Sequence, residues 1–168
     1  AAVAEVDRVF SLGGVGAIAA LAHGTESVPA VDRIVGPGNV WVAEAKCQVA
    51  SHVPIDAPAG PSELLVLLDS GADVEAVARE LLAQAEHDPE AAVVAVALDA
   101  GTARRLLDRL SALAPAAERA DVVGPALAGR GAVLVASSVD EAVDFVERWA
   151  PEHLLLAVEG AAGLSRRI

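Results

Sequence analysis

Aromatic side chains are almost absent from this sequence of 168 residues. It has two Phe, two Trp and no Tyr, although 54% of its residues are hydrophobic. The core must therefore be built from Ala, Val and Leu, which suits helices packed closely on a buried β-sheet. A charged fraction of only 21% beside this apolar content excludes a disordered or fibrous chain.

Long apolar runs and basic residues are also lacking. No apolar run approaches the roughly 18 residues that a membrane-spanning helix needs, so we expect a soluble chain. Twelve basic residues stand against 24 acidic ones, which gives a net charge of -12. Such a charge repels phosphate backbones and anionic lipids, and therefore predicts neither nucleic acid nor a membrane as a partner.

Cysteine is nearly absent as well. Cys47 is single and cannot form an internal disulfide, and the first residues lack the basic segment and apolar core of a signal peptide. These features favour a cytoplasmic location. The sequence starts at Ala1 without Met and stops at Ile168 at the end of a helix-like stretch. We therefore expect a fragment, with neighbouring segments missing on both sides.

Predicted strands alternate with predicted helices along the chain. Continuous Val, Leu and Ala strands between helices are typical of parallel sheets with helices on both faces. The predicted strands are residues 8–12, 33–35, 64–68, 91–98, 132–136 and 154–158. The predicted helices are residues 16–22, 39–51, 74–87, 102–113, 139–149 and 161–167.

A stretch rich in Pro, Ala and Gly divides the chain unevenly. Residues 1–57 have two predicted strands and two helices, which are too few for an independent domain. Residues 58–61 form the predicted linker, and residues 62–168 contain nearly a full doubly wound sheet. The sequence thus predicts an α/β fold of two incomplete doubly wound, Rossmann-like domains with mainly parallel sheets.

Two glycine motifs lie in the first predicted domain. The run GVGAIA at residues 14–19, which includes Gly16, satisfies the dinucleotide-binding pattern G-x-G-x-x-A, but Val35 is followed by Gly36 where that pattern expects an acid. Close helix packing is the alternative. The run GPGN at residues 36–39 lets backbone approach an anionic ligand before a helix. Alternatively it is a tight turn with Asn39 as the helix cap.

Three polar motifs lie in the second predicted domain. Ser62 precedes a buried strand, where its hydroxyl could bind a ligand or its own backbone. Gln84 and His87, three residues apart at a helix end, project from one face as metal ligands do, although His87 could simply interact with the helix dipole. Glu152 and His153 could divide general acid and base work, or form a surface corner.

The predicted topology brings these three motifs together. In right-handed βαβ units, helix C-termini and strand N-termini share one edge of the sheet. Ser62, the Gln84/His87 pair and the Glu152/His153 pair should therefore lie at that edge. The GPGN run lies at the opposite edge of the first domain, where α/β ligands usually bind. A cleft between the domains could be lined by both. Cys47, within a predicted helix, is interpreted as a small core residue.

Taken together, these stretches resemble the histidinol dehydrogenase family. They occur in the family's order and at its spacing, and they cover nearly the whole chain. The resemblance rests on HGTESVP at 23–29, VDRIVGPGN at 31–39, EAK at 44–46, AGPSE at 59–63, LAQAEHDPE at 82–90 and PEHL at 151–154. It implies an aldehyde-dehydrogenase-like fold, with residues 1–57 as the last part of the NAD-side domain.

The resemblance also implies a reaction and its residues. Zinc-dependent oxidation of L-histidinol to L-histidine through the aldehyde would use two NAD. Gln84 and His87 would ligate zinc and contact substrate together with Ser62. Glu152 would activate water, and His153 would act as the base and contact substrate. Cofactor contacts would come from Asn39 and from the position of Gly16.

Two departures from the family matter. The family usually has Gln at the position of Gly16, and that Gln helps to hold NAD. The family's other two zinc ligands, an Asp and a His, lie beyond the end of this chain, as do the segments that join its homodimer. The chain would then carry half of a metal site and be inactive alone.

Two alternative functions stay open. One is a non-catalytic α/β binding module. The other is an aldehyde-dehydrogenase-type oxidoreductase that uses Cys47 as nucleophile, which the position of Cys47 in the middle of a predicted helix disfavours.

Overall fold

The computed structural model describes residues 5–57 and 61–168. The chain divides into two compact units, Ala1–Gly60 and Pro61–Ile168. Their boundary lies within the predicted linker at residues 58–61. Each unit has its own buried core.

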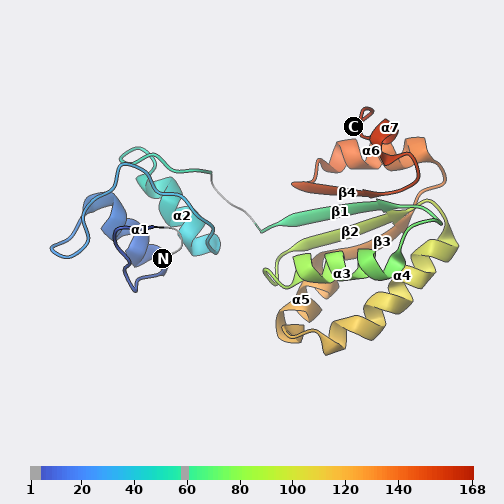
Figure 1. Ribbon diagram of the computed structural model, residues 1–168, viewed down its shortest axis with the longest axis horizontal. Helices are drawn as coiled ribbons and strands as arrows, with labels where there is room; N and C mark the ends of the chain where they lie inside the picture. Colours follow the sequence, from blue (N-terminus) through green and yellow to red (C-terminus); the bar gives the residue numbers. More distant parts are fainter. Residues whose placement is uncertain (1–4, 58–60) are drawn as a thin grey trace. The chain divides into compact units, whose positions relative to one another are not determined.

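The second unit is built on a four-stranded parallel sheet with the order β3-β2-β1-β4. Figure 1 shows this sheet between two layers of helices. Strands β1 and β2 lie in its centre and are buried on both faces, which explains their continuous apolar sequences. The strands are β1 (Glu63–Leu68), β2 (Ala92–Ala97), β3 (Gly131–Val135) and β4 (His153–Ala157). The predicted α/β class with a parallel sheet is confirmed.

Successive residues of the central strands face opposite helical layers. Val66 and Leu68 of β1 pack in the core shared with α3 (Val74–Ala85), α4 (Ala100–Leu113) and α5 (Ala120–Arg130). Leu65 and Leu67 pack in the core shared with α6 (Val139–Trp149) and α7 (Ala161–Leu164). This alternation is the two-residue period of a strand. Because helices pack on both faces, the positions of the strand ends are fixed.

Side-chain caps mark where three of these helices begin. The Asp73 carboxylate accepts hydrogen bonds from the backbone N–H groups of Glu75 and Ala76, so Asp73 is the N-cap of α3. Asp99 and Ser138 cap α4 and α6 in the same way. Each cap satisfies N–H groups that have no partner within the helix.

Helix α5 was not predicted from the sequence. It contains Gly124, Pro125 and Gly129, which are all poor helix formers, so its intrinsic tendency to form a helix is weak. Val123 and Ala126 of α5 are fully buried against the core. Tertiary packing therefore overrides local propensity here.

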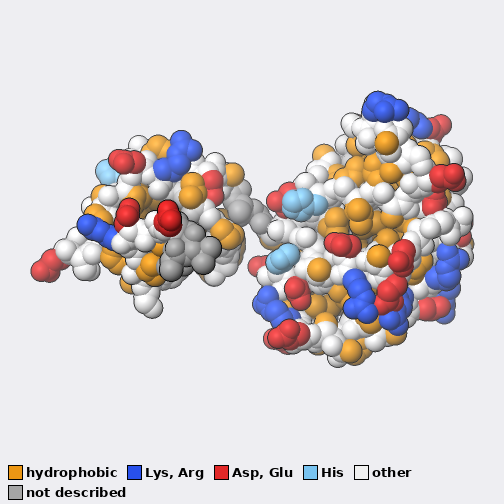
Figure 2. All heavy atoms as spheres, viewed as in Figure 1, with side chains coloured by type: hydrophobic (Ala, Val, Ile, Leu, Met, Phe, Trp, Pro, Cys, Tyr) orange, Lys and Arg blue, Asp and Glu red, His pale blue; other side chains and the backbone are white. Residues whose placement is uncertain are grey.

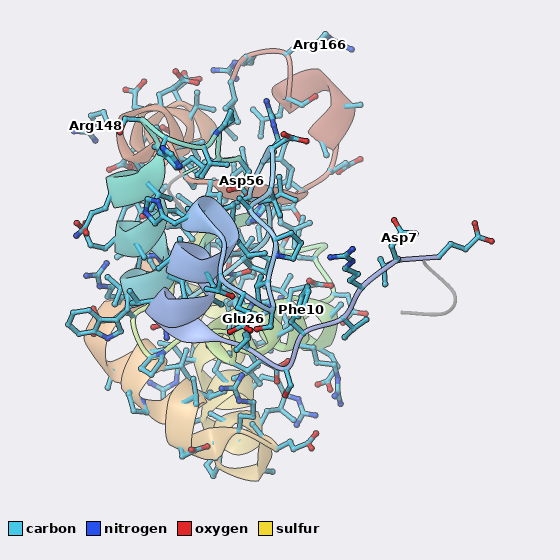
Figure 3. All side chains as sticks on the ribbon, turned by 90° about the vertical axis from the view of Figure 1, so that its left-hand side faces the viewer. Asp7, Phe10, Glu26, Asp56, Arg148 and Arg166 are labelled. Carbon is cyan, nitrogen blue, oxygen red and sulfur yellow. The ribbon has the colours of Figure 1, made fainter. Side chains whose placement is uncertain are left out.

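The first unit differs from its predicted sheet. Its helices are α1 (Gly14–His23) and α2 (Val40–Val49), and residues 8–13 form no strand. Figure 3 shows Asp7 and Phe10 on a single extended segment. The predicted strand at residues 33–35 is reduced to one parallel bridge between Ile34 and Ile55. A strand needs partners for its backbone groups, and the described residues of this unit supply only that bridge.

No helix in the described part of the chain combines the length and the apolar character needed to cross a membrane.

Candidate functional site

The sheet register fixes which residues meet at the edge where the strands begin, called the strand-start edge below. Glu63 of β1 is paired with Ala92 of β2, and Leu64 is paired with His153 of β4. Ser62 and Glu152 therefore come immediately before neighbouring strands. The expectation that the motifs before β1 and β4 share an edge is met by this geometry.

Glu152 and His153 form a connected pair at this edge. One carboxylate oxygen of Glu152, Oε2, accepts a hydrogen bond from the backbone N–H of Glu63 at 3.3 Å. The other, Oε1, lies 3.7 Å from Nε2 of His153. Both side chains are more than half exposed, at 55% and 59%. The pair can thus exchange protons with a bound molecule while the carboxylate stays attached to the sheet.

Ser62 is anchored to the sheet through its backbone. Its carbonyl oxygen accepts a hydrogen bond from the N–H of Ala92 at 3.1 Å, and its side chain is half-buried. The next residue, Glu63, donates its N–H to Glu152. Ser62 is therefore adjacent in sequence to the group that holds the carboxylate. The role of this backbone N–H was missed by the sequence reasoning, because a side-chain pattern contains no signal for it.

Gln84 lies in the last turn of helix α3, whereas His87 lies in the turn after it, because the helix ends at Ala85 rather than at the predicted residue 87. The guanidinium of Arg119 donates a hydrogen bond to the carbonyl of Glu86 at 2.6 Å, and the N–H of His87 donates to the carbonyl of Gln84 at 3.3 Å. In the turn that follows, the Asp88 carboxylate accepts a hydrogen bond from the N–H of Glu90. These bonds fix the backbone that carries both candidate metal ligands.

The side chains of these two ligands are in contrasting environments. Gln84 is half-buried, and its amide nitrogen Nε2 is buried without a hydrogen-bond partner among the described residues. A buried amide that lacks a partner costs about 1–3 kcal/mol. Nε2 can only donate hydrogen bonds, so a metal would have to bind the other amide atom, Oε1. His87 is exposed. Figure 2 shows histidine side chains at the surface of the second unit.

The donor set fits zinc only in part. An imidazole nitrogen suits zinc well and an amide oxygen suits it less well, and closed zinc sites have about four ligands. Within residues 5–57 and 61–168, no three His, Cys, Asp or Glu side chains are grouped as a metal site. Gln84 and His87 could therefore supply two ligands, and the remaining ligands would have to come from elsewhere.

In the first unit, residues 36–39 form a bend and a short loop before α2, called the GPGN turn below. The Asn39 side chain accepts a hydrogen bond from the N–H of Val42 at 3.1 Å, so the interpretation as a helix cap is confirmed. Gly36 has a φ of +125°, which side chains rarely tolerate. A Cβ atom on Gly38 would lie 2.3 Å from Cγ1 of Val42. Both glycines are thus required by the turn itself.

The G-x-G-x-x-A run lacks the context of a dinucleotide fingerprint. It opens α1 at Gly14, but no strand precedes it in the described chain. Gly16 is exposed, and a Cβ atom there would meet open space. Close packing of Gly16 is therefore not the reason for glycine at this position. Its proposed cofactor contact is tested by none of these observations.

Cys47 is exposed, so its interpretation as a core residue is wrong. It lies in the last turn of α2, whose other face packs against α1 through Ala45. The negative end of a helix dipole disfavours a thiolate, which argues against a nucleophilic role. His23 and His52 were not expected to lie together, and their ring centroids are 4.8 Å apart.

Comparison with known proteins decides the family. The family model for histidinol dehydrogenase matches residues 1–168, the whole chain. The chain belongs to the histidinol dehydrogenase family. Its two units are accordingly parts of a histidinol dehydrogenase fold. The crystal structure of histidinol dehydrogenase from Elizabethkingia anophelis superposes on 99% of this chain, with a TM-score of 0.92 and 34% identity.

Curated histidinol dehydrogenases are similar over nearly the entire chain. The protein from Pseudomonas putida is 49% identical over 158 residues, which are 94% of this chain and 36% of its own length. The Natronomonas pharaonis protein is 50% identical over 167 residues, or 99% of this chain and 40% of its own. The chain thus spans about two fifths of the length of these relatives.

Proposed function

We propose that this chain belongs to an enzyme that oxidises L-histidinol to L-histidine through histidinal, in histidine biosynthesis. One observation carries the proposal: Glu152, His153 and Ser62 meet at one sheet edge within a chain of this family. When bound, NAD would accept a hydride in each oxidation, and zinc would orient the imidazole and amine of the substrate. The complete enzyme is proposed to be a cytoplasmic homodimer.

His153 would take the proton of the substrate hydroxyl in the first oxidation. Its side chain is 59% exposed, so a substrate can reach it. Removal of the hydroxyl proton is needed as the hydride leaves the same carbon, because the alcohol then becomes an aldehyde. A base positioned for this transfer typically contributes about 10²–10⁴-fold to the rate.

Glu152 would take a proton from the water that attacks the aldehyde. The hydrogen bond from the Glu63 N–H leaves its other oxygen, Oε1, directed toward His153. The hydrate formed by this attack would then lose a hydride in the second oxidation, and His153 would again take the hydroxyl proton. Dividing the two proton transfers between neighbouring groups lets one site perform both steps.

Ser62, Gln84 and His87 would bind and orient the substrate. Gln84 and His87 are proposed as two zinc ligands, and Ser62 as a substrate contact beside Glu152. Asn39 and the position of Gly16 are proposed NAD contacts in the first unit. The hydrogen bond from Val42 occupies Oδ1 of Asn39 and leaves its amide N–H groups as donors.

The first test measures zinc content and NADH formation in the complete enzyme. We expect two NADH for each histidinol consumed. Gln84→Ala and His87→Ala should each lower both the bound zinc and the rate, because each removes one ligand. The matched control is Gln48→Ala, which removes an exposed amide on α2. Full zinc content in both ligand variants would show that the metal is bound elsewhere.

A further inference from the structure

Lys46, the single lysine of the chain, is buried inside the first unit. Its side chain in α2 is only 3% exposed. Its ammonium group donates hydrogen bonds to the backbone carbonyl of Gly36 and, at 2.7 Å, to the Asp56 carboxylate. A lysine is almost never buried unless it is paired, so this arrangement needs a reason.

Asp56 holds the other backbone group of the same glycine. Its Oδ1 accepts from Lys46, and its Oδ2 accepts from the N–H of Gly36 at 2.8 Å. Asp56 is placed there by the short bridge between the two segments, since its own N–H donates to the carbonyl of Ile34. Both backbone groups of Gly36 are therefore bound by one ion pair.

The ion pair persists over the physiological pH range. The hydrogen bond from Lys46, followed by that from the Gly36 N–H, holds the pKa of Asp56 far below its usual range. The charge of Lys46 is neutralised by Asp56 rather than left for a ligand. Lys46 is thus not arranged as a direct phosphate-binding group.

The consequence of this pair concerns the GPGN turn. Gly36 begins the turn with a φ of +125°, and Asn39 ends it as the cap of α2. Fixing both the carbonyl and the N–H of Gly36 defines the direction in which the chain enters the turn. It thereby fixes the position of Asn39 and of the helix N–H groups that favour an anion.

We propose that Lys46 and Asp56 are positioning residues for NAD, which act by holding Gly36 and hence the GPGN turn in its binding geometry. This inference rests on the proposed function, in which the turn contacts NAD. It assigns no contact with NAD to either residue. Loss of the pair should therefore weaken NAD binding and leave the zinc and proton-transfer groups of the second unit unchanged.

The experiment compares Lys46→Met and Asp56→Asn with the unaltered complete enzyme. We expect the NAD dissociation constant from calorimetry, and the KM for NAD, to rise about 10-fold or more, since charged hydrogen bonds are lost. The KM for histidinol and kcat at saturating NAD should stay within about 2-fold. Lys46→Arg, which keeps a cation, should retain most of the affinity. Glu44→Gln lies exposed on the same helix and removes one negative charge, as Asp56→Asn does, and it should have no effect.

A further variant covers the case in which one single variant fails to fold. Lys46→Met/Asp56→Asn removes both charges, which avoids an unpaired buried charge. The double variant should bind NAD more weakly than the unaltered enzyme does, because the carbonyl of Gly36 loses the hydrogen bond from Lys46. A folded double variant, or a folded Lys46→Met, with unaltered NAD affinity would overturn the positioning role alone. Absence of NAD binding by the unaltered enzyme would overturn both this role and the proposed cofactor.

Discussion

Individual residues at the candidate sites are held mainly by backbone groups. The Glu63 N–H holds Glu152, and the Val42 N–H binds Asn39. The sequence predicted the Glu152/His153 juxtaposition and offered Asn39 as a cap, because both depend on near neighbours in the chain. It did not reveal the pairing of Lys46 with Asp56. Those residues are ten positions apart, and no periodic pattern relates them.

Two glycine substitutions in the first unit should have opposite effects on stability. Gly38→Ala places Cβ against Val42, which must shift or strain the turn, and we expect a loss of about 1–3 kcal/mol. Gly16→Ala adds Cβ in open space within α1, and we expect a gain of up to about 0.5–1 kcal/mol. Urea unfolding of each variant, followed by circular dichroism, measures this difference. A Gly38→Ala variant as stable as Gly16→Ala would disprove the close approach.

At the scale of elements, the sequence predicted what local signals encode. The apolar strands and the capped helices of the second unit follow from short-range periodicity and cap residues, of which Asp73 is an example. Helix α5 and the missing strand at residues 8–12 depend on tertiary partners. Because residues 8–12 have no neighbouring strand in the described unit, a β-rich pattern alone does not produce a sheet.

One ion-pair cluster joins helices α3 and α4. The Glu75 carboxylate accepts hydrogen bonds from Arg109 of α4 and from Arg79 of its own helix. The hydrogen bond with Arg109 is the main cause that lowers the pKa of Glu75 from 4.5 to about 2. Because the folded-state pKa is below the unfolded value, the stabilisation is present above pH 4.5 and is lost as the pH falls toward 2.

Glu75→Gln should therefore remove a pH-dependent part of the stability. We expect its melting temperature to lie below that of the parent at neutral pH, and the difference to shrink as the pH falls from 4.5 to about 2. Thermal unfolding over this pH range measures the effect. Asp108→Asn, which alters an exposed pair with Arg104 on α4, is the control with a smaller effect expected. A difference that stays constant with pH would contradict the assignment.

At the scale of the whole molecule, the two units carry different parts of the proposed reaction. The first has the GPGN turn with its Lys46–Asp56 ion pair, and the second has the strand-start edge. The second unit has the larger core, with two buried clusters on either side of its sheet, whereas the first has one small cluster. The proposed proton-transfer groups, Glu152 and His153, thus lie on the more extensively packed unit.

Under the proposed function, Glu152 and His153 perform separate proton transfers at the strand-start edge. The direct measurement is single-turnover NADH formation from histidinol and from histidinal in the complete enzyme, with zinc content determined alongside. His153→Asn should slow both steps by about 10²–10⁴-fold. Glu152→Gln can still accept from the Glu63 N–H, so it should keep its position and mainly slow oxidation of histidinal.

Glu147→Gln, an exposed change on α6, serves as the matched control and should leave both steps unchanged. Both site variants should retain zinc, because neither residue is a proposed ligand. The predicted result is a loss confined mainly to the histidinal step in Glu152→Gln, with both steps slowed in His153→Asn. Equal slowing of both steps by Glu152→Gln, or loss of zinc from either variant, would contradict the division of roles.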